Sequence, residues 1–240
     1  LCGGWRQRNG KGASGAMGGQ GAAEIAWIGV DWGTSNLRAH AVSATGALLG
    51  TRSSDQGMSR LTPAGFEPAL AALIAPWLAP GQPMAVLACG MVGAKQGWAE
   101  APYRAVPCAP VMAGTLMAVG THDPRLKVAI VPGLSQMAPP DVMRGEETQI
   151  AGFLAQNPGF EGAICLPGTH SKWVRIEAGR VVGFTTFMTG ELFAVLCAHT
   201  VLRHSLATDG FDEAAFAQAA HEAALDPARL GRDLFGLRAQ

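Results

Sequence analysis

The amino-acid sequence predicts an α/β protein of two lobes, each built on three consecutive strands followed by a helix. Strand-like apolar runs come in two groups of three, at 25–32, 37–44 and 47–52, and at 162–167, 172–177 and 181–187. In both groups a Gly-Thr dipeptide separates the first strand from the second, as Gly33-Thr34 and Gly168-Thr169. This internal repetition favours two domains over one large domain.

The remainder of the first lobe alternates helix and strand signals. Residues 66–78 carry apolar side chains at helical spacing, with Pro68 in what would be the first turn. Residues 84–89 predict a short strand that enters the Gly-rich loop 90–103, and residues 127–131 predict a strand stopped by a Pro-Gly pair. Residues 109–119 fit either helix or loop.

We predict a helix over about 145–155, with Glu146 and Glu147 in the first turn, where the helix dipole favours carboxylates. After the second strand group we predict helices over about 190–204, capped by Thr189, and over 212–224, with a further one beginning at Pro227. The expected organisation is a flexible Gly-rich tail (1–23), a substrate-side lobe (24–140) and an incomplete nucleotide-side lobe (141–240).

Composition excludes several classes of function. The formal net charge is zero and no basic run is present, so neither nucleic acid nor an anionic membrane is an expected partner. The apolar runs, such as 192–197, are too short to span a bilayer. Five scattered cysteines without a CxxC pair predict buried thiols, a reducing compartment such as the cytoplasm, and no zinc site. The P-loop and G-x-G-x-x-G nucleotide signatures are missing.

The first Gly-Thr turn follows an aspartate at the end of a buried strand. Such a turn exposes backbone N–H groups and a hydroxyl in a small concavity that suits phosphate oxygens. We therefore expect Asp31 to hold Mg²⁺, and the following residues to bind phosphate: Gly33, Thr34, Ser35, Asn36 and Arg38. The alternative interpretation is an ordinary Asp-x-Gly hairpin.

The second turn supplies the corresponding candidates in the second lobe: Gly168, Thr169, His170, Ser171 and Lys172. Lysine is scarce in the chain, which draws attention to Lys172, although a salt-bridged surface lysine is the alternative. A hydrolase based on Ser171 and His170 is disfavoured, because G-x-S-x-G is absent and adjacent strand residues point to opposite faces.

Two further segments suggest a kinase acting on a small polar substrate. Transfer to a hydroxyl needs a carboxylate to accept the proton, and Glu147, or failing that Glu146, is the candidate base. The alternative for this pair is a solvated first helical turn. The loop after residue 89 mixes glycines with polar and aromatic residues, as a small-molecule pocket does. Its candidate substrate-binding residues, together with one nearby arginine, are Gly90, Met91, Lys95, Gln96, Trp98, Glu100 and Arg144.

These segments together resemble the 2-dehydro-3-deoxygalactonokinase family of the actin-like (sugar kinase/Hsp70, ribonuclease H-like) superfamily. The resemblance spans about 25–205 and rests on Asp31-Trp-Gly-Thr-Ser-Asn-Leu-Arg38, Cys89-Gly-Met-Val-Gly, Gln96-Gly-Trp-Ala-Glu-Ala-Pro-Tyr103, Val131-Pro-Gly-Leu134, Asp141-Val-Met-Arg-Gly-Glu-Glu-Thr-Gln149, Leu166-Pro-Gly-Thr-His-Ser-Lys-Trp-Val174 and Phe187-Met-Thr-Gly-Glu-Leu-Phe193.

The resemblance implies ATP- and Mg²⁺-dependent phosphorylation of the 6-hydroxyl of 2-dehydro-3-deoxy-D-galactonate, a step in galactonate breakdown. It further implies that ATP lies between the lobes, and that the chain stops before the C-terminal portion that completes the adenosine pocket. The substrate carboxylate needs a cation or a helix N-terminus, for which Arg144, Lys95 and the start of the 145–155 helix are alternatives. Another sugar or acyl kinase or ATPase of the same fold, and an inactive sugar-acid-binding fragment, are the competing hypotheses.

Overall fold

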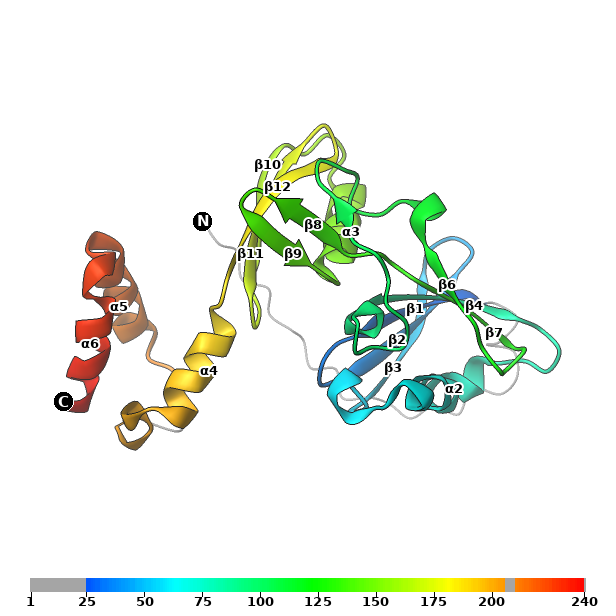
Figure 1. The fold of residues 1–240 in the computed structure, drawn as a ribbon, viewed down its shortest axis with the longest axis horizontal. Coiled ribbons are helices and arrows are strands. Elements are labelled where there is room, and N and C mark those ends of the chain that lie inside the picture. Colours follow the sequence, from blue (N-terminus) through cyan, green and yellow to red (C-terminus); the bar gives the residue numbers. More distant parts are fainter. Residues whose placement is uncertain (1–24, 206–209, 240) are drawn as a thin grey trace. The chain divides into compact units, whose positions relative to one another are not determined.

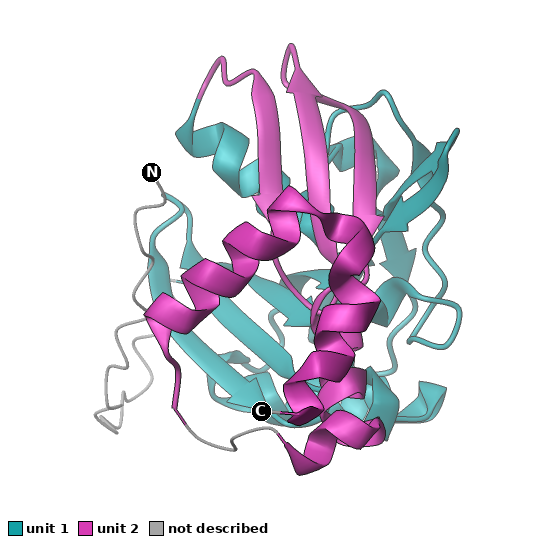
Figure 2. Ribbon diagram, turned by 90° about the vertical axis from the view of Figure 1, so that its left-hand side faces the viewer, with its two compact units in different colours: residues 1–157 teal, residues 158–240 magenta. Residues whose placement is uncertain are grey.

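The structure is a computed structural model that describes residues 25–205 and 210–239. It divides the chain into two compact units, Leu1–Asn157 and Pro158–Gln240, which are coloured separately in Figure 2. The expected tail (1–23) lies outside the described residues. No helix of the described part is long and apolar enough to cross a membrane.

A six-stranded mixed sheet forms the centre of unit 1 (Figure 1). Its order is β3-β2-β1-β4-β7-β6. The first three strands form an antiparallel meander, β4 and β7 continue from β1 in parallel, and β6 pairs antiparallel with β7. The strand bounds are β1 Ile25–Trp32, β2 Leu37–Ser43, β3 Leu48–Ser54, β4 Met84–Gly90, β6 Met117–Val119 and β7 Leu126–Ile130.

One face of this sheet packs against α2 (Phe66–Ile74) and contains the core of unit 1. In β1, alternate residues Ile28, Val30 and Trp32 are buried in that core, whereas Asp31 lies on the opposite face and is partly exposed. The helix contributes Phe66 and other wholly buried side chains, and the Phe66 ring lies 5.0 Å from that of Trp32. Each such apolar side chain stabilises the fold by roughly 1.5–3 kcal/mol.

The rest of unit 1 consists of a small second sheet, a helix and short 3-10 turns. The sheet has the order β5-β8-β9, with β5 Arg104–Ala105, β8 Leu134–Met137 and β9 Pro140–Met143. The helix, α3 (Glu146–Gln156), follows β9 directly. The 3-10 turns are η1 Met58–Arg60, η2 Pro63–Gly65, η3 Ala75–Trp77, η4 Met91–Gly93 and η5 Ala113–Thr115.

Unit 2 begins with a three-stranded antiparallel sheet of order β10-β11-β12, followed by helices. The strands are β10 Gly162–Leu166, β11 Ser171–Glu177 and β12 Arg180–Phe187. The helical segments are α4 Gly190–His199, η6 Val201–His204, α5 Glu213–Leu225, η7 Pro227–Arg229, α6 Leu230–Gly236 and η8 Leu237–Ala239. The strand-strand-strand-helix order that opens unit 1 thus occurs in this unit as well.

Most predicted elements occur, with specific differences. The first predicted helix ends at Ile74, because Pro76 falls in a 3-10 turn that follows. The 190–204 helix changes to 3-10 geometry after His199. The ambiguous segment 109–119 contains η5 and β6, and the β5-β8-β9 sheet was not predicted at all. The division between the units falls after Asn157 and not near 140, so α3 belongs to unit 1.

The prediction of buried thiols is wrong at one position. The four described cysteines are free, and Cys89, Cys108 and Cys197 are partly buried, but Cys165 is exposed. In β10 only Ile164 is buried, and its neighbours in the strand face the other side of the sheet, which unit 2 leaves open. An apolar run in the sequence therefore does not guarantee that every member is covered.

Candidate functional site

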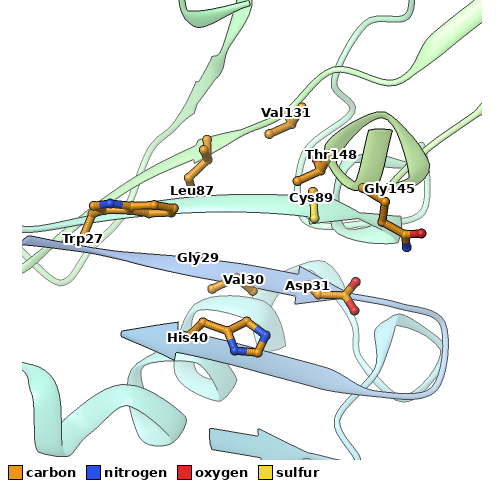
Figure 3. Close-up of a pocket in the computed structure, with 11 residues that line it drawn as sticks. Trp27, Gly29, Val30, Asp31, His40, Leu87, Cys89, Val131, Gly145 and Thr148 are labelled. Atoms are coloured by element: carbon orange, nitrogen blue, oxygen red, sulfur yellow. The ribbon is translucent and has the colours of Figure 1, made fainter. Parts of the chain in front are cut away.

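The candidate catalytic carboxylates gather in unit 1, where β1 and β4 end side by side. Asp31 and Cys89 are register partners in this parallel pair. Both line a pocket of about 250 Å³ whose walls also include Gly145, Thr148 and Gln149 at the start of α3. Figure 3 shows Asp31, Cys89 and Thr148 at this pocket. The carboxyl ends of parallel strands are where α/β proteins commonly bind ligands.

The pKa of the Cys89 thiol reflects the negative charge around this pocket. Its pKa is raised to about 12, first by burial and then by the negative charges of Asp31, Glu147 and Glu146, whereas a hydrogen bond with Thr148 lowers it. Carboxylates from β1 and from α3 therefore act on one thiol of β4. The thiol itself stays protonated and unreactive.

Two glycines allow α3 to begin against the end of β4. Gly90 and Gly145 have φ values of +91° and +108°, which L side chains rarely adopt. A Cβ on Gly145 would lie 3.3 Å from the Gly90 Cα, and a Cβ on Gly90 would lie 2.8 Å from the Trp32 carbonyl oxygen. Glycine at both positions therefore lets the start of α3, which carries Glu146 and Glu147, lie against the end of β4.

The two glutamates occupy different environments. The Glu147 side chain is wholly buried, its Oε2 accepts a hydrogen bond from the Gly145 N–H at 2.7 Å, and its Oε1 accepts one from the Thr148 hydroxyl at 3.2 Å. Burial is the main cause that raises its pKa to about 7. Glu146 is partly exposed, and its Oε2 accepts a hydrogen bond from the Arg144 N–H at 3.1 Å.

These environments argue against the order of preference taken from the sequence. A pKa near 7 suits a general base, but a base has to touch the substrate hydroxyl. Glu147 is wholly buried, whereas Glu146 is partly exposed. Glu146 is therefore the better-placed candidate, and Glu147 is placed to hold the start of α3.

Hydrogen bonds from η1 hold the first Gly-Thr turn. The Gly33 carbonyl accepts a hydrogen bond from the Met58 N–H, and the Thr34 carbonyl accepts from both the N–H and the hydroxyl of Ser59. A Cβ on Gly57 would lie 2.2 Å from the Ser35 carbonyl carbon, so only glycine permits this approach. The turn residues Thr34, Ser35 and Asn36 stay exposed.

Two opposite charges flank this turn. The Arg38 Nη1 lies 3.4 Å from the Asp31 Oδ2, and about half of each side chain is exposed. An ion pair this open to water contributes little to stability. Both groups are therefore available to a ligand.

The second Gly-Thr turn is held in the same manner by the start of α4. The Gly168 carbonyl accepts hydrogen bonds from the Gly190 N–H and the Thr189 hydroxyl, and the Thr169 carbonyl accepts from the Glu191 N–H. Thr189 does occupy the N-cap position, but its hydroxyl donates to the Gly168 carbonyl and makes no cap hydrogen bond to α4. Gly168 and Thr169 stay exposed.

The polar residues after the second turn have separate partners. The Nε2 of His170 lies 2.5 Å from the Glu191 carboxylate, and the Ser171 hydroxyl lies 2.5 Å from that of Thr189. His170 and Ser171 thus do not form a nucleophile–base pair. Lys172 is buried and its Nζ donates to the Thr186 hydroxyl at 2.9 Å, so the alternative of a surface lysine does not hold.

The loop after β4 divides into exposed and packed parts. Lys95, Gln96 and Glu100 are exposed, and Met91 is partly buried in η4. The Trp98 ring stacks on Phe66 at 6.3 Å and meets Trp32 edge-on, so it anchors the loop to the core. This packing argues against Trp98 as an aromatic wall of a sugar pocket.

Arg144 projects into the same loop. Its Nη2 donates to the Ala101 carbonyl at 2.8 Å, and its guanidinium carbon lies 4.3 Å from the centre of the Tyr103 ring. Its Nε and Nη1 are buried and, within the described residues, have no hydrogen-bond partner. Unsatisfied buried donors of this kind are rare in proteins.

The donor set at Asp31 fits Mg²⁺ better than metals that need a full protein cage. Among the described residues no group of three or more His, Cys, Asp or Glu could hold a metal ion. Mg²⁺ usually keeps several waters and binds through one or two carboxylates plus substrate phosphates. Asp31, at the pocket, supplies a carboxylate of that kind.

The sequence analysis did not predict that η1 and the start of α4 hydrogen-bond to the two turns. Gly57 and Gly190 each stand three residues after the third strand of their group ends. That shared spacing was a signal in the sequence. Thr148 and Cys89, by contrast, carry no local pattern that reveals their contacts.

Comparisons with known proteins agree on one family. The sequence model of the family described as 2-keto-3-deoxy-galactonokinase matches residues 31–240. A probable 2-dehydro-3-deoxygalactonokinase of Rhizobium meliloti is 43% identical over 216 residues, which are 88% of this chain and 70% of that protein. The 2-dehydro-3-deoxygalactonokinase of Escherichia coli is 38% identical over 183 residues, which are 75% of this chain and 58% of that protein.

A solved structure is also similar. It is that of a protein of Sinorhizobium meliloti described as a putative 2-dehydro-3-deoxygalactonokinase, with a TM-score of 0.81 and 41% identity. The match covers 89% of this chain and 71% of that one.

Proposed function

Since the chain belongs to the 2-keto-3-deoxy-galactonokinase family, we propose that it phosphorylates the 6-hydroxyl of 2-dehydro-3-deoxy-D-galactonate with ATP. We further propose that the chain has the actin-like fold and that this step belongs to galactonate breakdown.

One observation supports the proposal more than any other. Asp31 of β1 and Cys89 of β4 line one pocket with the start of α3, the negative charges of Asp31 and Glu146 both act on the Cys89 thiol, and an exposed Gly-Thr turn follows Asp31. A kinase needs this combination: a carboxylate for the metal, a carboxylate for the hydroxyl, and backbone donors for phosphate. An ordinary hairpin has no need of the acidic residues on α3.

The residues would divide the reaction as follows. The Gly33–Asn36 turn and the Gly168–Lys172 segment each donate to phosphate oxygens of ATP, and Arg38 and Lys172 neutralise part of their charge. Glu146 orients the 6-hydroxyl and accepts its proton. The hydroxyl oxygen bonds to the γ-phosphorus, the bond from that phosphorus to the bridging oxygen breaks, and ADP leaves.

Asp31 is the residue that would hold Mg²⁺, directly or through water. When bound, the ion supplies charge neutralisation to the phosphates. The ion pair between Asp31 and Arg38 is exposed and weak, so Asp31 would be available to the ion and Arg38 to a phosphate.

A panel of 2-keto-3-deoxy acids in a coupled assay of ADP release tests the proposal. We expect 2-dehydro-3-deoxy-D-galactonate to give the highest kcat/KM, and Asp31→Asn to reduce it and to raise the Mg²⁺ concentration required. A higher kcat/KM for another acid would reassign the substrate within this fold. Binding of the sugar acid without binding of MgATP, measured by calorimetry, would support the inactive sugar-acid-binding fragment instead.

A further inference from the structure

Among the described residues, no carboxylate pairs with the Arg144 guanidinium. Arginine keeps its proton at any ordinary pH, so a buried guanidinium carries a full positive charge. Within the described residues Arg144 forms no ion pair, and two of its three nitrogens are buried without an acceptor. Burying an unpaired charge is costly, so a buried cation of this kind normally has an anionic partner.

The surrounding residues hold this cation in one place. The Ala101 carbonyl binds its Nη2, and the Tyr103 ring faces its guanidinium carbon. On a third side a Cβ at Gly93 would lie 2.8 Å from Nη1, so glycine at this position makes the room. Three residues of loop 90–103 therefore contact the Arg144 guanidinium on different sides.

The two other sources of positive charge suggested by the sequence are less suitable. Lys95 is exposed, so its ammonium is hydrated and screened. At the start of α3, the Gly145 N–H already donates to Glu147 and the Arg144 N–H to Glu146. Those two carboxylates also repel an incoming anion.

We infer that Arg144, seated on Tyr103 and Ala101, binds the C1 carboxylate of the sugar acid. This inference rests on the proposed function and names the residue that makes the enzyme specific for acids over neutral sugars. An anion bound here supplies the counter-charge that the described protein residues do not provide.

Calorimetric titration of the chain with 2-dehydro-3-deoxy-D-galactonate and with its neutral C1 amide tests this. The acid should bind about 10- to 100-fold tighter than the amide, as expected for hydrogen bonds to a charged group. Arg144→Gln should remove that preference, whereas Arg144→Lys should keep part of it, because it retains charge without the planar donors. Lys127→Gln removes an exposed charge on β7 and should retain the full preference.

The outcomes separate this inference from the proposed function. A folded Arg144→Gln that still prefers the acid by the wild-type factor overturns the inference and leaves the kinase proposal standing. A wild-type protein that binds MgATP but neither sugar compound overturns the proposed substrate, and the inference with it. Where Arg144→Gln does not fold, a crystal structure of the wild type with the acid decides, because a carboxylate on Lys95 or on the start of α3 contradicts the assignment.

Discussion

The two Gly-Thr turns share a backbone arrangement but differ in the charges around it. In each, the glycine and threonine carbonyls accept N–H groups from a segment that follows the third strand, η1 in unit 1 and the start of α4 in unit 2. The first turn has a half-exposed aspartate before it and acidic residues of α3 nearby. The second is followed by a buried lysine.

Hydrogen bonding therefore fixes the shape of each turn, whereas the flanking side chains determine its chemistry. In both turns the glycine and threonine carbonyls are engaged by the segment that follows, and in the first turn the Gly33 N–H also donates to the Asn36 carbonyl. A carboxylate beside the first turn suits a metal ion, and a cation beside the second suits phosphate oxygens. We therefore expect the chemical step to depend on the surroundings of the first turn.

The largest expected effect is on turnover when the proposed base, Glu146, is removed. Glu146→Gln should lower kcat by roughly 10²–10⁴, the usual contribution of a general base, with a much smaller change in KM for ATP. Steady-state measurement of ADP release checks this.

Glu147→Gln is the matched comparison, since it makes the same change one residue along α3. We expect it to retain more activity than Glu146→Gln. The reverse result would return the role of base to Glu147. Normal turnover in both variants would remove the base from this segment.

The second expected effect is a pH dependence of stability that arises in unit 1. Burial raises the pKa of Glu147 from 4.5 to about 7, so between these values the folded state binds more protons than the unfolded state. The stability that this carboxyl contributes is complete below pH 4.5 and is lost as the pH rises towards 7, by about 3 kcal/mol.

Chemical denaturation of the wild type and of Glu147→Gln across pH 5–8 isolates this contribution. The difference in unfolding free energy should shift in favour of the variant as the pH rises to 7 and then level off. A constant difference across that range would contradict the buried, protonatable carboxyl.

The smallest expected effect concerns the glycines under the two turns. Gly57→Ala should destabilise the protein by about 1–3 kcal/mol, since its methyl would meet the backbone of Ser35. Gly190→Ala should cost less, because its closest contact, the Gly168 carbonyl oxygen, would lie 2.6 Å away. Thermal unfolding measures both.

Matched controls exist in each unit. Gly152 in α3 and Gly231 in α6 have no atom within 4 Å of a Cβ, so alanine at either should be neutral or stabilising. Equal stability of Gly57→Ala and Gly152→Ala would contradict the close contact between Gly57 and the backbone of Ser35.

The sequence was sufficient to predict the features that depend on local pattern. The two strand groups, the turns at Gly33 and Gly168, and the helix that begins after Gly145 are all marked by apolar periodicity or by glycine. The β5-β8-β9 sheet could not be predicted in this way. Its strands are two to four residues long, too short for alternation to show, and one begins at a proline.

The candidate site was predictable in its members but not in their environments. Sequence alone cannot tell that Glu147 is buried and Glu146 is not, because both stand in one helical turn and the difference depends on which side faces β4. In the same way Trp98 and Lys172 carry polar or aromatic groups that suggest ligand binding. Only the packing against Phe66 and the hydrogen bond to Thr186 show how they are held.

Hydrogen–deuterium exchange with and without a non-hydrolysable MgATP analogue shows whether both Gly-Thr turns bind phosphate. We expect slower exchange of amides in 33–36 and in 168–171 when the analogue is present, with no change in β3 as an internal reference. Protection of one turn alone, or of neither, would contradict this expectation.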